Sequence, residues 1–412
     1  MIELDLARQQ LLAACPTIEP IEIHSAEALD CVLADDVVAT TDVPPFDNSS
    51  VDGYAVRRAE LDGADRAHPA RFEVLGSVLA GQVADVPVGP GQAWKVMTGA
   101  PLPDGADVVV MVENSSASQR DSRAVPGDEV ELYAQPRPGA GIRRAAGDVA
   151  RGEVVFERGT VLRAPHLGVL ASVGAHRVRV YPRLRVGVLV TGDELVTEAR
   201  PLEPGEIYES NRAMLMSLVR KVNCEPIDLG VAGDDLSALQ SRLAGAIAEC
   251  DVIITSGGVS MGDADPIKAV LDRMGRLNWL QLAIRPAKPF AYGVLDGPTL
   301  LLGLPGNPVS SLLSFILVAA PALRRMMGHR DVFPDVIRAI ADVDFEPPHR
   351  DGRTAYLRAD ARFGPDGRLH VRPVARQDSH QLSATANANA VVRVPDGAQP
   401  AAGEDVDVIL LI

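Results

Sequence analysis

The segment LRVGVLVTGDE, residues 184–194, decides the fold class of this chain. Its apolar run from Leu184 to Val190 contains β-branched residues, which is typical of a strand buried on both faces of a parallel sheet. The polar turn TGDE ends this strand. Further strand-like runs (CEPIDLG, DVIITS and PTLLLGL) alternate with helix-like segments up to Gly328. This alternation predicts a doubly wound, mostly parallel α/β sheet that begins near Pro182.

The segments on either side have a different character. From Pro45 to about Val180 the chain is rich in glycine, proline and valine, and short runs such as AWKVMTG and DVVVMVEN predict a β-rich arm. From about Val332, strand-like runs and turns alternate, as in GRTAYLRADARFGPDGRLHVRPV, which predicts a small β-barrel. The expected fold class is therefore α/β plus β. A length of 412 residues favours two to four domains.

Composition argues against several classes of protein. The formal net charge of -15 disfavours a nucleic-acid partner, which needs a basic face. The longest apolar run, from Val309 to Leu323, is interrupted by serines and too short to cross a bilayer, so we expect a buried helix and no membrane association. The N-terminus lacks a basic leader before an apolar stretch, which predicts a cytoplasmic protein. The four cysteines lie far apart, which argues against a disulfide framework or a zinc ribbon. The histidines do not have the HExxH spacing of a zinc hydrolase.

Polar residues concentrate at the predicted carboxyl ends of the strands. Four consecutive ends read TGDE (residues 191–194), GVAGD (230–234), SGGVSMGDAD (256–265) and GLPGNP (303–308). In an open α/β sheet, ligands bind in the crevice beyond the carboxyl ends of the strands. We therefore expect the ligand site at this edge of the sheet.

Individual residues at this edge admit two interpretations. The segment Ser256–Gly258 could present backbone N–H groups to a phosphate, or could simply form a tight turn between strand and helix. Asp234, Asp265 and Asn307 stand where helix N-caps are expected, which accounts for them without a ligand. Glu194 is different, because no long helix follows it directly. A carboxylate at the end of a buried parallel strand favours a functional role.

The arm contains one unusual polar cluster. In PPFDNSSVDGYAV, residues 44–56, an Asx-type turn accounts for Asp47 to Ser49 but explains Asp52 less well. KVMTGAPLPDGAD, residues 95–107, could be a plain strand and turn. The charged segment GIRRAAGD, residues 141–148, could be a solvated run of charges.

Seven motifs in succession resemble those of the molybdopterin molybdenumtransferase (MoeA) family. They read DNSSVDGYAV, VMTGAPLPDGADVVVMVE, TGDEL, GEIYESN, TSGGVSMGDAD, AIRPAKPFAYG and GLPGNPVSS, and they occur in the order of the family. The resemblance runs from the N-terminal helix into the C-terminal barrel, and it is specific because no single motif carries it alone. The related C-terminal region of gephyrin and the plant molybdenum-insertion proteins share the pattern.

The resemblance implies an elongated homodimer whose active cleft lies between the α/β domain of one subunit and the arm of the other. Adenylylated molybdopterin would be the substrate, molybdate the co-substrate and Mg²⁺ the cofactor, and AMP would leave as molybdenum cofactor forms. Molybdopterin adenylyltransferase and recipient molybdoenzymes would be transient partners. The expected divisions are a linking domain (1–44 and 145–181), the arm (45–144), the molybdopterin-binding α/β domain (182–329) and the C-terminal barrel (330–412).

The resemblance also assigns site residues. The implied catalytic residues are Asp52, Thr98, Asp148, Glu194, Asp234 and Asp265. Four of them would be metal ligands, namely Asp52, Asp234, Asp265 and Glu194. Oxygen ligands can hold a hard cation, which would neutralise a pyrophosphate, and Thr98 would contribute a hydrogen bond. The implied ligand-binding residues are Ser256, Gly257, Gly258, Ser260, Arg285, Lys288, Pro305, Gly306, Asn307 and Pro308. Among these, Arg285 and Lys288 would hold phosphate or molybdate, and Pro305 and Pro308 would shape their loop.

This chain departs from the pattern of the family at three places. Many members have Lys-Pro-Gly-Lys-Pro where residues 285–289 read RPAKP, so a planar guanidinium replaces a compact ammonium. Ser50 stands in place of a usual alanine, and His380 stands where glycine is common. These departures leave the class of protein intact, but they bear on oxyanion preference and turnover.

Two other functions were weighed against molybdate insertion. A molybdopterin adenylyltransferase would have the α/β domain without the arm and barrel, so the DNSSVDGYA segment argues against it. A non-catalytic molybdopterin-binding or scaffolding paralogue is disfavoured because every acidic residue of the set is present. Molybdate and tungstate are both tetrahedral dianions of similar size, so the sequence alone admits either.

Overall fold

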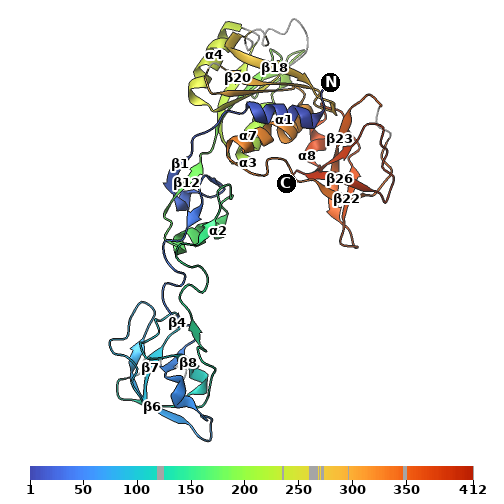
Figure 1. The fold of residues 1–412 in the computed structure, drawn as a ribbon. Helices are drawn as coiled ribbons and strands as arrows, with labels where there is room; N and C mark the ends of the chain where they lie inside the picture. The colour runs from blue at the N-terminus through green and yellow to red at the C-terminus, as the bar shows by residue number, and fades with distance from the viewer. Residues whose placement is uncertain are drawn as a thin grey trace.

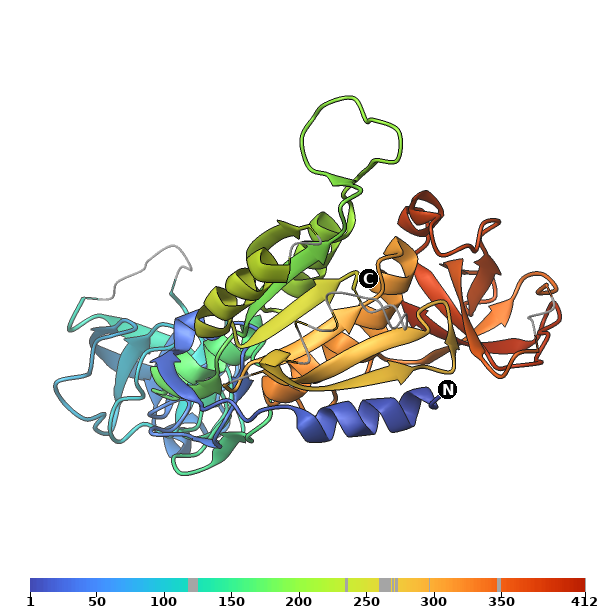
Figure 2. The same ribbon diagram turned by 90° about the horizontal axis from the view of Figure 1, so that it is seen from above.

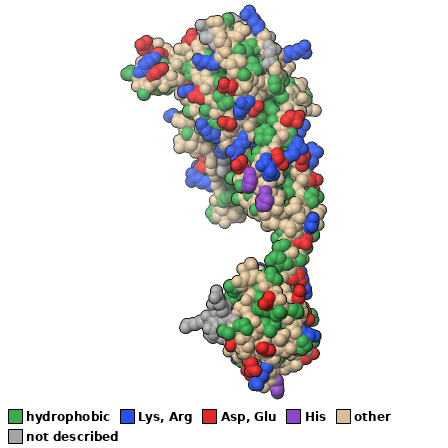
Figure 3. Space-filling model, turned by 90° about the vertical axis from the view of Figure 1, so that its left-hand side faces the viewer, with side chains coloured by type: hydrophobic (Ala, Val, Ile, Leu, Met, Phe, Trp, Pro, Cys, Tyr) green, Lys and Arg blue, Asp and Glu red, His purple; other side chains and the backbone are tan. Residues whose placement is uncertain are grey.

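The computed structural model describes residues 1–117, 125–233, 236–258, 268, 270, 273–295, 297–346 and 350–411. The molecule is elongated, with the α/β domain and the C-terminal barrel together at one end and the β-rich arm at the other (Figure 1). A narrow region joins the two ends. Figure 3 shows this waist in a space-filling view, with acidic and basic side chains interspersed over the face that it presents.

The α/β domain is built on a six-stranded sheet in the order β16-β13-β17-β21-β20-β18. Four neighbouring strands run parallel: β16 (Glu225–Ala232), β13 (Arg185–Thr191), β17 (Val252–Ser256) and β21 (Leu300–Leu304). All residues of β17 and β21 and all but the first of β13 are buried. The apolar runs in the sequence therefore predicted these three strands correctly.

Helices cover both faces of this sheet. On one face α1 (Leu4–Ala14), α3 (Asn211–Lys221) and the helical stretch Pro308–Met326 pack around a shared apolar core. On the other face α4 (Leu236–Glu249) packs around a second core. The predicted doubly wound architecture is confirmed. α1 lies on the α/β domain although the whole arm separates the two in sequence.

The stretch Pro308–Met326 consists of α6 (Pro308–Ser314), the π-helical η4 (Phe315–Ala319) and α7 (Ala320–Met326). Among the helices that the structure describes, it alone is long and apolar enough to cross a membrane. However, 83% of its apolar window is buried inside the protein. It is the core helix that the apolar run from Val309 to Leu323 predicted.

One edge of the sheet differs from the sequence prediction. β18 (Gly275–Gln281) and β20 (Pro289–Leu295) pair antiparallel with each other, and β20 pairs antiparallel with β21. The sequence pattern predicts neither strand. The reason is visible in β18, where half-buried and exposed residues alternate at the start of the strand, so no continuous apolar run marks it.

The arm and the region that links it to the α/β domain are rich in short strands. The arm contains β4 (Asn48–Ser49), β5 (Gly53–Val56), η2 (Arg58–Leu61), β6 (Ala70–Val78), β7 (Gln92–Val96), β8 (Val108–Met111), η3 (Val112–Asn114), β9 (Glu129–Leu132) and β10 (Ile142–Arg143). Five of these strands form a sheet in the order β8-β5-β7-β6-β9, with apolar clusters against it. The linking region contains β1 (Ile21–His24), η1 (Ser25–Glu27), β2 (Val32–Leu33), β3 (Val37–Val38), β11 (Val154–Phe156), α2 (Ala164–Ser172) and β12 (Arg177–Tyr181).

The C-terminal strands close into a barrel, as predicted. Its strands are β22 (Ile337–Ala341), β23 (Thr354–Phe363), β24 (Leu369–Pro373), β25 (Ala390–Val394) and β26 (Asp405–Leu410), with α8 (Leu382–Ala386) before β25. The ring closes because β23 pairs with both β24 and β25. The short strand β19 (Ile284–Arg285) of the α/β domain also pairs with β23, which joins the two domains. The α/β plus β fold class is confirmed.

Candidate active site

A cleft of about 760 Å³ opens at the carboxyl edge of the sheet. From β13 the chain passes through α3 to β16, which lies on one side of β13, whereas β17 and then β21 lie on its other side. The ends of β13 and β17 therefore form a topological switch point. The predicted catalytic residue Glu194 lines this cleft. So do seven of the predicted ligand-binding residues: Ser256, Gly257, Gly258, Pro305, Gly306, Asn307 and Pro308.

The turn after β17 requires glycine. Gly257 and Gly258 have φ values of 98° and 67°, in the left-handed region that other residues disfavour. A Cβ on Gly257 would lie 2.6 Å from the hydroxyl oxygen of Thr191, so glycine lets this turn pass close to the end of β13. The N–H of Gly257 donates to the carbonyl of Leu304 at 3.1 Å. This N–H is therefore used within the fold, which agrees with the interpretation of the segment as a tight turn, although Gly257 does line the cleft.

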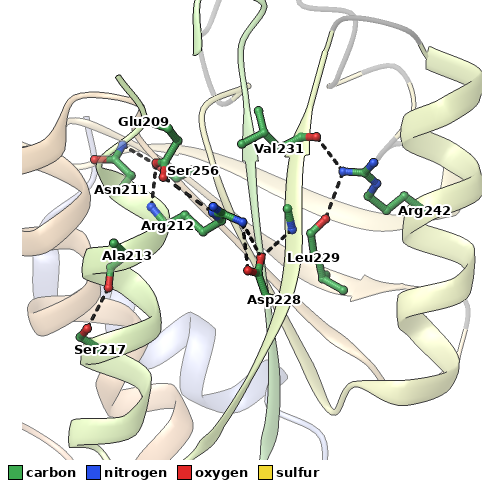
Figure 4. A network of polar contacts seen from close by, with 11 residues as sticks. Glu209, Asn211, Arg212, Ala213, Ser217, Asp228, Leu229, Val231, Arg242 and Ser256 are labelled. Atoms are coloured by element: carbon green, nitrogen blue, oxygen red, sulfur yellow. Dashed lines mark hydrogen bonds and ion pairs between the residues drawn. The ribbon is translucent and has the colours of Figure 1, made fainter. Parts of the chain in front are cut away.

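A buried polar network lies under the cleft. Asn211, the first residue of α3, donates from Nδ2 to Ser256 Oγ at 3.0 Å and to the carbonyl of Gly306 at 2.6 Å (Figure 4 shows the first of these bonds). Ser256 Oγ donates in turn to the carbonyl of Pro305 at 3.2 Å and lies 3.4 Å from Ser311 Oγ. Asn211 is 5% exposed and the two serines are fully buried. The network ties the ends of β17 and β21 to the start of α3.

The described part of the cleft lining is acidic. Glu194 is exposed, whereas the side chain of Glu209 is only 4% exposed. Glu209 Oε1 accepts from the backbone N–H of Arg212 at 2.7 Å, and the guanidinium of Arg212 binds both carboxylate oxygens of Asp228 at 3.1 and 2.9 Å (Figure 4). Neither lysine nor arginine is found among the described residues that line the cleft.

A projecting loop stands at the mouth of the cleft. β14 (Leu195–Val196) and β15 (Ile207–Tyr208) pair in parallel and line the cleft, and residues 197–206 between them extend away from the domain (Figure 2). The guanidinium of Arg200 donates to both carboxylate oxygens of Glu206 at 2.7 Å. These bonds, with a further one from the backbone N–H of Glu203, lower the pKa of Glu206 to about 2. An ion pair and a hydrogen bond within the loop therefore hold it together.

The C-terminal barrel supplies another wall of the cleft. His380 lines it, and the carbonyl of the preceding Ser379 accepts from the N–H of Val309 in α6 at 3.1 Å. Arg358 on β23 is fully buried, and its guanidinium donates to the carbonyls of residues 376, 377 and 378 at 2.6, 2.9 and 3.3 Å. These bonds hold the segment that carries Ser379 and His380 in place. We had not assigned Arg358 any role, because an arginine in a strand usually lies at the surface.

Arg285 and Lys288 line a second cavity, of about 830 Å³, between the α/β domain and the barrel. It adjoins the first cleft, because Pro289 and Ser310 line both. The guanidinium of Arg285 lies 3.0 Å from a carboxylate oxygen of Asp351, so this arginine already has an anionic partner within the chain. The two predicted cationic residues therefore stand beside the acidic cleft and not in it.

Two of the predicted catalytic residues lie together in the arm. Asp52 Oδ1 accepts from the backbone N–H of Thr98 at 2.7 Å and from its hydroxyl at 2.8 Å. Both residues are exposed. Asp52 lies between β4 and β5, and Thr98 follows β7. Both hydrogen bonds of this pair are made by the same carboxylate oxygen of Asp52.

Two charged residues of the arm have partners that the sequence does not predict. The sequence suggests an Asx-type turn at Asp47, but its carboxylate lies 2.6 Å from the guanidinium of Arg144 and accepts from the N–H of Ala145 at 2.8 Å. The bonds from Ala145 and Arg144 lower the pKa of Asp47. Arg144 is therefore ion-paired and not merely solvated. Asp148 lies at the root of the arm, where its backbone N–H donates to the carbonyl of Val43 at 2.9 Å.

One chain does not bring the two groups of predicted residues together. Asp52 and Thr98 are in the arm, whereas Glu194 follows β13 at the opposite end of the molecule (Figure 1). Three predicted site residues lie outside the described residues: Asp234, Ser260 and Asp265. Within the described ranges, no group of three or more His, Cys, Asp or Glu side chains could hold a metal ion. Those parts of the chain therefore do not assemble the predicted metal site.

The fold and cleft define a class of multidomain protein in which an α/β ligand-binding domain is joined to a β-rich arm and a closed barrel. The sequence matches the MoeA N-terminal region (domain I and II) over residues 2–174, the probable molybdopterin binding domain over 187–325 and the MoeA C-terminal region (domain IV) over 339–411. The chain therefore belongs to the MoeA family, as its motifs indicated.

Full-length relatives agree with this assignment. The molybdopterin molybdenumtransferase of Haemophilus influenzae is 36% identical over 411 residues, which cover 99% of this chain and 98% of the relative. Molybdopterin molybdenumtransferase 2 of Mycobacterium tuberculosis is 35% identical over 406 residues, 97% of this chain and 96% of the relative. The crystal structure of the molybdopterin biosynthesis MoeA protein from Pyrococcus horikoshii superimposes with a TM-score of 0.80 at 31% identity, covering 100% of both chains.

Proposed function

We propose that this chain is a molybdopterin molybdenumtransferase, which inserts molybdate into adenylylated molybdopterin and releases AMP. One observation carries the proposal. Residues of TGDEL, GEIYESN and GLPGNPVSS and the described start of TSGGVSMGDAD, which are far apart in the sequence, line a single cleft at the switch point of the sheet. In the reaction, the dithiolene of the substrate takes up molybdate, the phosphoanhydride bond breaks and AMP leaves.

The residues of this chain would bind and orient the substrate. The glycine turn after β17 and the Pro305–Pro308 turn form the floor of the cleft, where small residues leave room for a large ligand. Arg285 and Lys288 in the adjoining cavity are candidates to hold an oxyanion, as a phosphate or as molybdate. The two cavities share Pro289 and Ser310, so a single extended ligand could reach both.

The acidic lining fits a hard divalent cation such as Mg²⁺. Glu194 and Glu209 line the described part of the cleft, and no lysine or arginine is among its described lining residues, although Arg212 Nε lies 3.8 Å from Glu209 Oε2. Like charges would repel an anionic ligand. Carboxylate oxygens are the ligands that such cations prefer. We assign Glu194, Asp234 and Asp265 to metal or water positioning from the α/β domain, and Asp52 to the same task from the arm. Bound Mg²⁺ would neutralise charge on the phosphates.

The position of Asp52 in the arm leads us to propose a homodimer. Asp52 and Glu194 belong to opposite ends of one elongated chain, so they could share a site only if the arm of a second copy reached the cleft of the first (Figure 1). A symmetric dimer would then contain two composite sites. Asp52 and Thr98 of one copy would face Glu194 of the other across each site.

The defining experiment supplies the purified chain with adenylylated molybdopterin, molybdate and Mg²⁺ and follows AMP release. We expect AMP release that stops in a strong chelator and resumes when excess Mg²⁺ is added. Glu194→Ala should slow the reaction, whereas Glu203→Ala, which removes an acid of the neighbouring exposed loop, should not. Absence of AMP release under all conditions would contradict the proposed reaction. Full release in the chelator would contradict only the role of Mg²⁺, and tungstate in place of molybdate would show the oxyanion preference.

A further inference from the structure

Asn211 joins three segments that meet under the cleft. It begins α3, and its amide nitrogen donates to Ser256 Oγ at the end of β17 and to the carbonyl of Gly306 in the turn after β21. The distances are 3.0 and 2.6 Å. Both acceptors belong to segments that line the cleft. The sequence marked Asn211 only as part of a helix start.

The hydrogen-bond partners fix the orientation of this amide. The carbonyl oxygen of Gly306 can only accept, so the nitrogen of Asn211 and not its oxygen must face it. Ser256 Oγ accepts from the same nitrogen and donates its own hydrogen bond to the carbonyl of Pro305 at 3.2 Å. The Pro305–Gly306 turn is therefore held at two successive carbonyls, at Gly306 by Asn211 itself and at Pro305 by Ser256, to which Asn211 is bonded.

The two hydrogen bonds of Asn211 do not satisfy its whole side chain. Its Oδ1 is buried and has no hydrogen-bond partner in the part of the chain that the structure describes. An unpaired buried acceptor destabilises the folded state. Nor does the residue serve as a cap, because the N-cap of α3 is Ser210, whose side chain makes no capping hydrogen bond. The amide nitrogen of Asn211 therefore makes both of its hydrogen bonds while its oxygen makes none with the described residues.

We propose that Asn211 is a positioning residue for the reaction. It acts through Ser256 and Gly306, and it holds the turns after β17 and β21 in the one arrangement that receives the substrate. The inference rests on the proposed function, since it concerns the same cleft. Small displacements of groups that orient a substrate reduce turnover strongly, so the loss should fall on kcat more than on KM.

The test compares Asn211→Ala with Asn223→Ala. Asn223 follows the other end of α3, has a φ of 61° and donates from Nδ2 to the carbonyl of Asp30 at 2.8 Å. We expect Asn211→Ala to lower kcat for AMP release by roughly 10- to 100-fold with a smaller change in KM, and also to lower the melting temperature, because two buried hydrogen bonds are lost. Asn223→Ala should lower the melting temperature and keep kcat, because alanine disfavours that backbone conformation.

Asn211→Asp provides a second variant of almost the same shape. Its ionised carboxylate cannot donate to Gly306, but its protonated form can. Relative to the unmodified chain, kcat of this variant should therefore rise as the pH falls, whereas that of Asn211→Ala should not. Wild-type kcat in Asn211→Ala would overturn the proposal. So would losses of kcat and melting temperature that match those of Asn223→Ala.

Hydrogen exchange tests the positioning without any assay of activity. Amides of residues 256–258, 303, 304, 306 and 307 should exchange faster in Asn211→Ala than in the unmodified chain, and should be unchanged in Asn223→Ala. Unchanged exchange in Asn211→Ala would overturn the inference. The exchange measurement remains informative even if the unmodified chain releases no AMP. That result would contradict the proposed function and not the positioning role of Asn211.

Discussion

The cleft and the arm carry the two halves of the predicted site, and they are built in opposite ways. In the cleft, Asn211 and Ser256 are at most 5% exposed and hydrogen-bonded to each other and to backbone carbonyls. In the arm, Asp52 and Thr98 are exposed and bonded to each other. A buried network keeps its geometry without a ligand, whereas water competes for an exposed pair. The fold therefore holds the cleft residues more firmly than it holds the arm pair.

The strongest test of this contrast mixes two inactive chains. Asp52→Ala and Glu194→Ala should each lower AMP release by roughly 100-fold, the scale of losing one positioned electrostatic group. If the arm of one copy completes the cleft of the other, chains mixed and allowed to exchange subunits form some dimers with one intact site. Random exchange should restore about a quarter of the wild-type activity.

The mixture distinguishes the composite site from a site within one chain. A mixture of Glu203→Ala and Asp52→Ala chains serves as the control. Its activity should equal the sum of the activities of the two chains measured separately, because subunit exchange creates no additional intact site. If the mixture of Asp52→Ala and Glu194→Ala stays as inactive as its parts after verified subunit exchange, the two residues act within one chain or not together. The separation seen in Figure 1 would then need a large movement of the arm.

Thr98→Val sharpens the description of the arm. Valine keeps the shape of threonine and the backbone N–H to Asp52, but it removes the 2.8 Å hydrogen bond from the hydroxyl. We expect AMP release to fall roughly 10-fold with little change in melting temperature, because one hydrogen bond to a charged group is lost at the surface. Thr40→Val is the matched control. It removes a hydroxyl that donates to the carbonyl of Val173 in the linking region, so stability should fall and activity should remain.

The frame of the cleft could be predicted from the sequence for a physical reason. A parallel strand buried on both faces must be apolar along its length, so β13, β17 and β21 are visible as runs. The carboxyl ends of such strands meet at one edge, which places Glu194 and the Pro305–Pro308 turn in one cleft without knowledge of the packing.

The groups that hold the cleft in shape could not be predicted in this way. Asn211 bonds to Gly306, which is 95 residues away, and Arg358 bonds to carbonyls 18 to 20 residues away. Only the tertiary fold brings such acceptors together, so by local pattern an asparagine at a helix start indicates a cap and an arginine in a strand indicates a surface residue. Likewise, the bond from Gly257 to Leu304 depends on how β17 and β21 end beside each other.

Substitution of Ala287, which lines the second cavity, tests whether the backbone is strained there. This buried alanine has a φ of 80°, at the position where many family members have glycine. Because a Cβ disfavours that conformation, Ala287→Gly should stabilise the α/β domain by about 1 kcal/mol, even though glycine makes the unfolded chain more flexible. Ala283→Gly, at a nearby buried position without a positive φ, should destabilise it by about as much. Equal losses of melting temperature in both variants would contradict the strain.

The smallest effect concerns the projecting loop, which is exposed like the arm but cross-linked within itself. Arg200 and Glu206 should keep residues 197–206 ordered at neutral pH. The pKa of Glu206 is lowered from 4.5 to about 2, so its contribution to order is complete above about pH 4.5 and is lost as the pH falls towards 2. Cleavage of the loop by pepsin, measured against cleavage elsewhere in the chain, should therefore rise over this range. In Glu206→Gln the loop should be cleaved more readily at pH 4.5 and show a weaker dependence on pH, whereas Glu203→Gln should behave like the unmodified chain. If the loop is equally resistant to pepsin in all three chains, contacts other than this ion pair keep it ordered. The loop would then not serve as an example of an exposed segment that is held by its own side chains.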